Sequence, residues 1–329
     1  MTEPGAVPVR LGLMFPGQGT QKVGMGRVVE RSSPAAAAVF DAADSVLDRD
    51  VRKLCFAGPT RELTLTQNAQ VAIFTCNAAV AAMLSEHGYQ PMVVLGHSVG
   101  ELNALVAAGV LTLEDGLRLV AARGALMGRI TTPGAMSSVL GLSPERVQGL
   151  CAQVSTPDRP VVGALINAPE NVVVSGATEG IDEFEPLALA AGALKATRLT
   201  VSSAFHSPLM AEAVAEWRAV VASASFQPPA IPVVLNTTGA QAKDADDIRQ
   251  ALVDQLTGPV RWVEDVRAAV SLGARLLIES GDSKALAGMV RSIDPGLPTV
   301  ILNDPRAIRR LREGHSLVPD AVHARTGAP

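Results

Sequence analysis

The amino-acid sequence predicts an α/β fold with a parallel sheet and a small ferredoxin-like subdomain inserted into the larger one. Three features predict it. Short apolar runs alternate with helical patterns through most of the chain, as in sheets whose parallel strands are joined by helices. One of these runs ends in a Gly-x-Ser-x-Gly turn that opens a helix. Residues 135–201 follow the order β-α-β-β-α-β, which is the ferredoxin-like order.

The composition fits one large α/β domain, or one domain with a smaller one. Of the 329 residues, 48% are hydrophobic and 18% are charged, which is enough to bury a sizeable core. The formal net charge of −4 predicts no nucleic-acid or membrane partner. The most apolar helical pattern, residues 71–84, is too short to span a bilayer, and the N-terminus has no signal-like apolar segment.

The cysteines predict a reduced, cytoplasmic compartment. They lie far apart in the sequence and lack the spacing of metal ligands, so we expect no metal site and three free, buried thiols, Cys55, Cys76 and Cys151.

The first strand, residues 9–15, leads into the glycine-rich loop PGQGTQKVGMG. A dinucleotide fingerprint would need glycine at the position of Lys22, and no phosphate-loop motif occurs, so we reject a nucleotide site. The loop lies where open α/β sheets place their ligand groups. Gln18 could present an amide or backbone donor to a ligand, but its position fits a polar turn residue equally well.

The helices of the first half have recognisable ends. Ser33 caps an alanine-rich helix that Pro34 opens, and a second helix covers residues 69–86. Residues 92–95 form a buried strand, residues 101–108 a helix, and residues 112–130 a further helix with Thr112 as its cap.

The segment Gly96-His97-Ser98-Val99-Gly100 joins the buried strand to the helix after it. Strand, sharp turn and helix with serine at the apex form a nucleophile elbow, in which the glycines leave room for a strained turn. This geometry exposes the Ser98 hydroxyl at a positive helix end, and the Val99 amide becomes one oxyanion donor. An ordinary loop is the alternative, because the pentamer alone also occurs by chance.

Arg123 lies on an apolar helical stripe, with Leu119, Val120, Leu126 and Met127 three and four residues away. A charge left on such a stripe needs a partner, because an unpaired buried charge is costly. Two interpretations stay open. The side chain extends to solvent, or it forms a bidentate clamp for a substrate carboxylate.

The insertion and the second half of the large subdomain follow in order. Strands are expected at residues 135–142, 161–167, 171–175 and 194–201, and helices at 144–154 and 179–191. Next we expect a strand at 231–236, helices at 246–256 and 262–272, a strand at 275–279 and a helix opened by Gly281-Asp282-Ser283-Lys284. Six basic residues from Lys284 to Arg312 form either a binding surface for an acidic partner or a solvated face.

His206 is the candidate general base. Ser207 caps and Pro208 opens the helix that follows, so the imidazole lies at a helix N-terminus, where the neutral form is favoured. Three of the other histidines lie near helix ends or in the tail. His97 adjoins Ser98 but points away from it in an elbow, where packing or a structural hydrogen bond is expected. His206 is therefore chosen by elimination.

At this point the sequence resembles a known family. The motifs PGQGTQKVGMG, GHSVGELNALVAAG, AARGALM, NAPENVVVSG, SSAFHSPLM and DQLTGPVRW, spread over residues 15–263, resemble those of malonyl-CoA:acyl-carrier-protein transacylases and polyketide synthase acyltransferase domains. The resemblance implies a hydrolase-like α/β core with a ferredoxin-like insert. We place the large subdomain at 1–132 and 202–313, the small one at 133–201, and a tail at 314–329.

The resemblance also implies roles for the site residues. Ser98 is acylated, His206 is its base, Gln18 and the Val99 amide form the oxyanion hole, and the Gln255 carbonyl orients His206. Arg123 holds the malonyl carboxylate. The remaining substrate-binding positions are Asn167, Phe205, His97 and Met127; the Phe205 ring would crowd an α-methyl group and so favour malonyl. The candidate carrier contacts are Lys195, Lys284 and Arg291. One departure is that many members have Gly-Pro-Gly-Lys where this chain has Gly281-Asp282-Ser283-Lys284.

The expected activity is ping-pong transfer of malonyl from malonyl-CoA to an acyl carrier protein, in fatty-acid or polyketide synthesis, by a monomer without metal or redox cofactor. Three alternatives remain. A hydrolase would release the acyl group to water, although Arg123 argues against it. A non-catalytic carrier-docking protein would leave Ser98 unmodified. A transferase for methylmalonyl or another extender or starter unit would keep the same mechanism.

Overall fold

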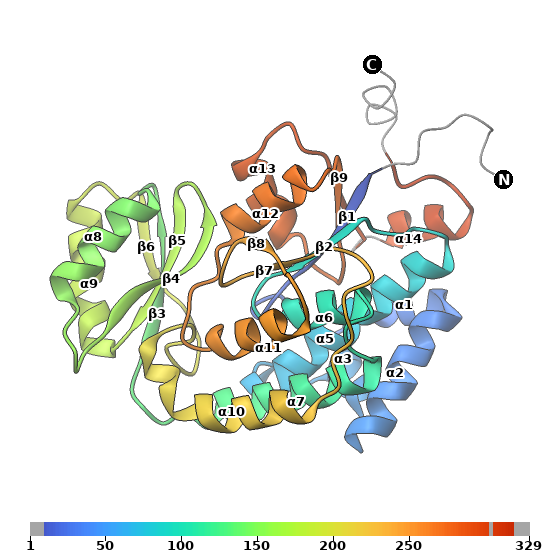
Figure 1. Cartoon of the computed structure of the whole chain (residues 1–329), viewed down its shortest axis with the longest axis horizontal. Coiled ribbons are helices and arrows are strands. Elements are labelled where there is room, and N and C mark those ends of the chain that lie inside the picture. Colours follow the sequence, from blue (N-terminus) through green and yellow to red (C-terminus); the bar gives the residue numbers. More distant parts are fainter. Residues whose placement is uncertain (1–9, 303–304, 319–329) are drawn as a thin grey trace.

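A computed structural model describes residues 10–302 and 305–318 (Figure 1). Two sheets organise it. The larger has six strands in the order β10-β9-β1-β2-β7-β8, and the smaller has four in the order β4-β5-β3-β6. Figure 1 shows the smaller sheet with its two helices to one side of the larger one. The predicted α/β class with a parallel sheet is confirmed.

The larger sheet is parallel apart from its β7–β8 edge. Its strands are β1 (Leu11–Phe15), β2 (Val93–Gly96), β7 (Val233–Leu235), β8 (Ala240–Gln241), β9 (Leu276–Glu279) and β10 (Thr299–Ile301). The central strands are fully buried and apolar, as expected of a parallel sheet covered on both faces.

Helices cover both faces of this sheet (Figure 1). Alternate residues of β1 divide between two cores: Leu13 and Phe15 pack toward α5 and α6, whereas Met14 packs toward α12 and α13. The helices of the large subdomain are α1 (Arg27–Ser32), α2 (Pro34–Leu47), α3 (Val51–Ala57), α4 (Thr60–Leu63), α5 (Thr66–Glu86), α6 (Gly100–Ala107), α7 (Leu113–Gly128), the short 3₁₀ turn η1 (Pro208–Met210), α10 (Ala211–Ser223), α11 (Ala245–Asp254), α12 (Trp262–Ser271), α13 (Ala285–Ile293) and α14 (Pro305–Arg312).

The smaller sheet is antiparallel throughout and has the predicted element order. It consists of β3 (Ala135–Leu140), α8 (Pro144–Val154), β4 (Val161–Ala168), β5 (Asn171–Gly176), α9 (Thr178–Ala190) and β6 (Lys195–Arg198). Its own core lies between the sheet and the two helices. Strand β4 also pairs with Val260 of the large subdomain, through hydrogen bonds at Ala164 and Ile166. The subdomain boundaries predicted above remain a prediction.

Helix α5 corrects one expectation. The helix expected over residues 69–86 begins at Thr66 and runs over 21 residues to Glu86, so it is longer than the apolar stretch 71–84. It is long and apolar enough to cross a membrane by length and composition alone. However, 72% of its most apolar window is buried inside the protein, where it packs against α2 and α7. Burial of this kind is the normal environment of a core helix, so its apolar character serves packing.

Other expectations held or fell outside the described residues. Ser33 and Thr112 cap their helices as predicted, Ser143 caps α8, and the three cysteines are free and buried. The helix expected after His206 begins as the short turn η1 before α10. Most of the predicted tail, residues 319–329, lies outside the described residues.

Candidate active site

The turn between β2 and α6 has the geometry of a nucleophile elbow. Ser98 has φ 54°, in the left-handed region that side-chain-bearing residues rarely adopt. A Cβ on Gly96 would lie 2.1 Å from the Gly100 carbonyl, and one on Gly100 would lie 2.2 Å from the Phe15 carbonyl oxygen. Because neither approach is sterically possible, both motif glycines are required, and the ordinary-loop alternative is excluded.

His206 lies directly against the serine, although 108 residues separate them. Ser98 Oγ is 2.7 Å from His206 Nε2, and His206 Nδ1 is 2.9 Å from the main-chain carbonyl oxygen of Gln255. A carbonyl can only accept a hydrogen bond, so Nδ1 carries the ring proton and Nε2 is free to accept from the serine hydroxyl. This is the tautomer that a general base requires.

The environment keeps this imidazole neutral. His206 is 3% exposed, and its backbone has φ 57°. Burial, followed by the nearby charge of Arg123, lowers the pKa of His206 to about 3. The side chain is therefore unprotonated at neutral pH and able to take a proton.

Arg123 is buried and does not extend to solvent. It is 1% exposed, and both of its terminal nitrogens donate to amide oxygens. Nη1 is 2.9 Å from Gln70 Oε1, and Nη2 is 2.9 Å from Gln255 Oε1 and 3.4 Å from Ser98 Oγ. Burial lowers the pKa of Arg123 to about 10, so it remains a cation at neutral pH. The structure thus places a buried positive charge beside the candidate nucleophile.

Two candidate oxyanion donors lie near Ser98. Val99 is the residue before α6, and in the described part of the chain its N–H has no hydrogen-bond partner. Gln18 lines the cavity that Ser98 also lines, and its Oε1 accepts a 3.4 Å hydrogen bond from Gln70 Nε2. Because Gln70 occupies the oxygen, the NH₂ of Gln18 is the end available to a ligand.

Ser98 opens into a cavity of about 390 Å³ between the two sheets. His97, Met127 and Phe205, three of the predicted substrate-binding residues, also line this cavity, and their role stays a prediction. Asn167 does not line it but accepts a 2.8 Å hydrogen bond from His97 Nε2, so it orients that ring. The full lining is Gln18, Gly19, Gln21, Thr64, Thr66, Gln70, His97, Ser98, Met127, Met136, Leu165, Leu199, Thr200, Val201, Ser202, Phe205 and His206.

Arg123, Val99 and Gln255 lie beside Ser98 without lining this cavity, and the three predicted carrier contacts lie away from it. Lys195, Lys284 and Arg291 are exposed on β6, before α13 and on α13, and none of them lines the cavity. Their assignment to carrier binding remains a prediction. Within the described residues, no group of three or more histidine, cysteine or acidic side chains could hold a metal ion.

Four buried polar residues in or behind the site were not predicted from the sequence: Gln70, which lines the cavity, and Glu101, Asn236 and Asp265, which do not. Asn236 follows β7 directly, at the carboxyl end of a parallel strand, where polar groups of α/β sites gather, so that signal was available. Gln70 lies on the apolar helix α5 and gave no such signal.

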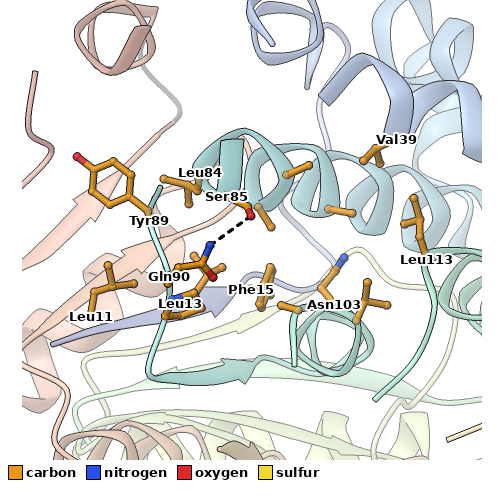
Figure 2. Close-up of a pocket in the computed structure, with 16 residues that line it drawn as sticks. Leu11, Leu13, Phe15, Val39, Leu84, Ser85, Tyr89, Gln90, Asn103 and Leu113 are labelled. Carbon is orange, nitrogen blue, oxygen red and sulfur yellow. Dashed lines mark hydrogen bonds between the residues drawn. The ribbon is translucent and has the colours of Figure 1, made fainter. Parts of the chain in front are cut away.

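A second cavity, of about 300 Å³, lies between β1 and α5 (Figure 2). Its walls are mainly apolar, including Leu13, Phe15 and Leu84, and Gln90 donates to Ser85 across 3.5 Å at one side. None of the predicted site residues lines it. The candidate nucleophile and base therefore line the cavity at Ser98 and not this second one.

Comparison with known proteins agrees with this geometry. Residues 13–291 match the family model described as an acyl transferase domain. The chain is 36% identical over 301 residues to a malonyl CoA-acyl carrier protein transacylase of Bacillus subtilis strain 168, covering 91% of this chain and 95% of that protein. It is 35% identical over 299 residues to the protein of the same name from Escherichia coli O157:H7, covering 90% and 96%.

Solved structures of similar proteins have the same fold. The malonyl CoA-acyl carrier protein transacylase of Coxiella burnetii superimposes with a TM-score of 0.90 at 32% identity, over 94% of this chain and 98% of that one. A malonyl-transacylase solved in complex with a type II polyketide synthase acyl carrier protein gives 0.88 at 33% identity, over 93% and 100%.

Proposed function

The chain belongs to the acyl transferase family, and we propose that it transfers malonyl from malonyl-CoA to the phosphopantetheine thiol of an acyl carrier protein, through an ester on Ser98. One observation carries this proposal. The Ser98 hydroxyl, which opens into the cavity, lies 2.7 Å from Nε2 of a neutral imidazole and 3.4 Å from Nη2 of a buried guanidinium. Nucleophile, base and carboxylate receptor are the three groups that malonyl transfer needs.

In the first half-reaction Ser98 Oγ attacks the thioester carbonyl carbon, and its proton moves to Nε2 of His206. The carbonyl oxygen becomes an oxyanion that the Val99 N–H and the Gln18 amide stabilise. The carbon–sulfur bond then breaks, and His206 returns the proton to the departing thiolate of coenzyme A. The product is a malonyl ester of Ser98.

The second half-reaction reverses these roles. The phosphopantetheine thiol of the carrier gives its proton to His206 and attacks the ester carbonyl. The oxygen of Ser98 leaves and recovers that proton, so serine and imidazole return to their starting state. These residues supply every proton transfer, and we propose that no metal or redox cofactor takes part.

Arg123 gives the site its preference for a carboxylated acyl group. Its terminal nitrogens are held by the uncharged oxygens of Gln70 and Gln255, so the planar guanidinium keeps a fixed orientation and its charge. A malonyl carboxylate entering the cavity would form a charge-assisted pair with it. Phe205 lines the same cavity, and its ring favours malonyl over α-methylated units. We propose a supply role in fatty-acid or polyketide synthesis in the cytoplasm.

Intact mass spectrometry tests the proposal. The protein is mixed with malonyl-CoA, and we expect one malonyl group on the wild type and none on Ser98→Ala. Addition of a phosphopantetheinylated carrier protein should then remove the group from the enzyme and place it on the carrier. Absence of an adduct on the wild type would refute acyl transfer. Equally fast loss without a carrier would identify a hydrolase instead.

Substitution of Arg123 tests the acyl preference. Arg123→Ala should lower the rate of malonyl loading by about 10- to 100-fold, because a hydrogen-bonded pair with a charged group is lost. Acetyl-CoA, which has no carboxylate, should load at a rate closer to that of the wild type. Undiminished malonyl loading by this variant would remove Arg123 from the substrate site.

A further inference from the structure

We infer that Asn236 is a positioning residue for acyl transfer, whose buried amide fixes the Ser98 turn and joins it to Gln255. The inference rests on the proposed Ser98 acyl-enzyme. Asn236 lies at the carboxyl end of β7, the strand that pairs with β2 just before the turn. Its side chain is fully buried, so it contacts neither solvent nor the substrate cavity.

The amide of Asn236 uses its whole hydrogen-bonding capacity. Its Nδ2 donates to the Gly96 carbonyl over 2.6 Å and to Asp265 Oδ2 over 2.9 Å. Its Oδ1 accepts from the Ser98 N–H over 2.8 Å and from Gln255 Nε2 over 3.1 Å. A primary amide has two donor hydrogens and two acceptor lone pairs, so all four are occupied.

These bonds span the strained part of the turn. Nδ2 of Asn236 binds the Gly96 carbonyl and Oδ1 binds the Ser98 N–H. The side chain therefore bridges the backbone at Ser98, where φ is 54°. Because the Ser98 N–H is directed into the protein at Asn236, it is not available to an oxyanion. The donor on the cavity side is therefore the Val99 N–H.

Gln255 carries the effect of Asn236 to the base and to the cation. Its Nε2 donates to Asn236 and, over 3.3 Å, to the Ser98 carbonyl. Its Oε1 accepts from Arg123, and its main-chain carbonyl accepts from His206. Asn236 thus lies behind Ser98 and next to Gln255, which contacts both His206 and Arg123.

Two buried carboxyl groups hold Asn236, one at its side-chain amide and one at its main chain. Asp265 accepts from Nδ2, and Glu101 accepts a 2.8 Å hydrogen bond from the main-chain N–H of Asn236. A flipped amide would set its oxygen against the Gly96 carbonyl and the Asp265 carboxyl, and its NH₂ against the Ser98 N–H. The Gly96 carbonyl can only accept and the Ser98 N–H can only donate, so these two contacts would be unfavourable and the main chain fixes the observed orientation.

The test compares Ser98 loading from malonyl-CoA in single-turnover mass spectrometry across three variants. Asn236→Ala and Asn236→Asp should each lower the rate constant at saturating malonyl-CoA by about 10- to 100-fold, because a small displacement of the reacting groups has effects of that size. The half-saturating concentration should change much less, since the side chain does not touch the cavity. Asn103→Ala is the matched control, because it removes another buried amide with two hydrogen-bond partners but no link to Ser98.

An exchange of the two side chains separates positioning from general loss of stability. In Asn236→Asp/Asp265→Asn the new carboxyl group, protonated because it is buried, can donate to the Gly96 carbonyl and accept from Ser98 and Gln255, and the new amide can donate to it. We expect this double variant to recover at least about tenfold of the loading rate lost in Asn236→Asp. Thermal unfolding of each variant shows which proteins are folded. If Asn236→Ala does not fold, the loading rate of the double variant relative to Asn236→Asp tests the inference instead.

Wild-type loading rates in folded Asn236→Ala or Asn236→Asp would overturn the inference. An equal loss of rate in Asn103→Ala, or no recovery in the folded double variant, would also overturn it. If the wild type itself forms no Ser98 ester, the proposed function fails first. The two failures are therefore distinguishable.

Discussion

Nη2 of Arg123 donates a 3.4 Å hydrogen bond to Oγ of Ser98. The same oxygen lies 2.7 Å from Nε2 of His206. The cation thus lies beside both partners of the proposed proton transfer. It stabilises negative charge that develops on the serine oxygen, and it opposes positive charge on the imidazole.

The first prediction concerns the pH dependence of Ser98 loading. The pKa of His206 is about 3, so the imidazole is neutral above that value. We expect the single-turnover rate constant to stay level as pH falls from 8 to roughly 5, and to decline only as pH approaches the pKa. Quenched-flow loading from malonyl-CoA, restricted to pH values at which the protein is folded, measures this profile.

The same profile tests the role of Arg123 in setting it. Arg123→Gln removes a positive charge that lowers the pKa of His206. The acid limb, which is the decline of the loading rate at low pH, should therefore move to higher pH. Arg129→Gln, at the exposed C-terminal end of α7, is the control and should leave the limb in place. An unchanged limb in Arg123→Gln would mean that burial alone keeps the imidazole neutral.

A second prediction distinguishes the two possible donors of Gln18. If the side-chain NH₂ stabilises the oxyanion, Gln18→Ala should lower the loading rate by roughly 10²- to 10³-fold, the usual effect of losing one such donor. Substrate binding should change little, because the donor acts on the transition state. A rate close to that of the wild type would show that Gln18 contributes only its backbone.

A third prediction concerns the close approach at the elbow. Gly100→Ala would bring a methyl group within 2.2 Å of the Phe15 carbonyl oxygen, so we expect severe destabilisation, of about 3 kcal/mol or more. Gly149→Ala on α8 is the control, because no atom lies within 4 Å of its Cβ position. It should stabilise the protein slightly, by up to about 1 kcal/mol. Urea unfolding measures both.

A fourth prediction follows from the buried carboxyl of Glu101. Burial raises its pKa from the ordinary 4.5 to about 7. Between these values the folded protein holds a proton that the unfolded chain has released, so stability falls as pH rises from about 4.5 to about 7. The 2.5-unit difference corresponds to a loss of about 3 kcal/mol.

Glu101→Gln removes this titration while keeping an oxygen for the N–H of Asn236. The gap, meaning the free energy of unfolding of the variant minus that of the wild type, should therefore increase as pH rises from about 4.5 to about 7. Above that range the gap should be constant. Unfolding free energies of both proteins at several pH values measure the gap. A gap that does not vary with pH would show that Glu101 titrates normally in the folded protein.

Much of the fold followed from local pattern. The Gly96–Gly100 turn and the alternation at 135–201 depend on near-neighbour chemistry, and both were predicted. Short elements such as α3, α4 and β8 were missed, because so few residues carry no clear periodicity.

The site was predictable only in part. Periodicity left Arg123 undecided, because its burial depends on the oxygens of Gln70 and Gln255, which lie 53 and 132 residues away in the sequence. The hydrogen bonds of Asn236 likewise reach Ser98 and Gly96 across 138 and 140 residues. Only the folded chain brings such pairs together.

The amide oxygens that hold Arg123 have a practical consequence for anyone handling the protein. Within the described residues no carboxylate forms an ion pair with this cation, and in the proposed function it binds a carboxylate beside the serine. Small organic acids in storage or assay buffers, such as acetate or free malonate, should compete with the thioester for it. Rates compared between laboratories will agree only when the anions present are the same.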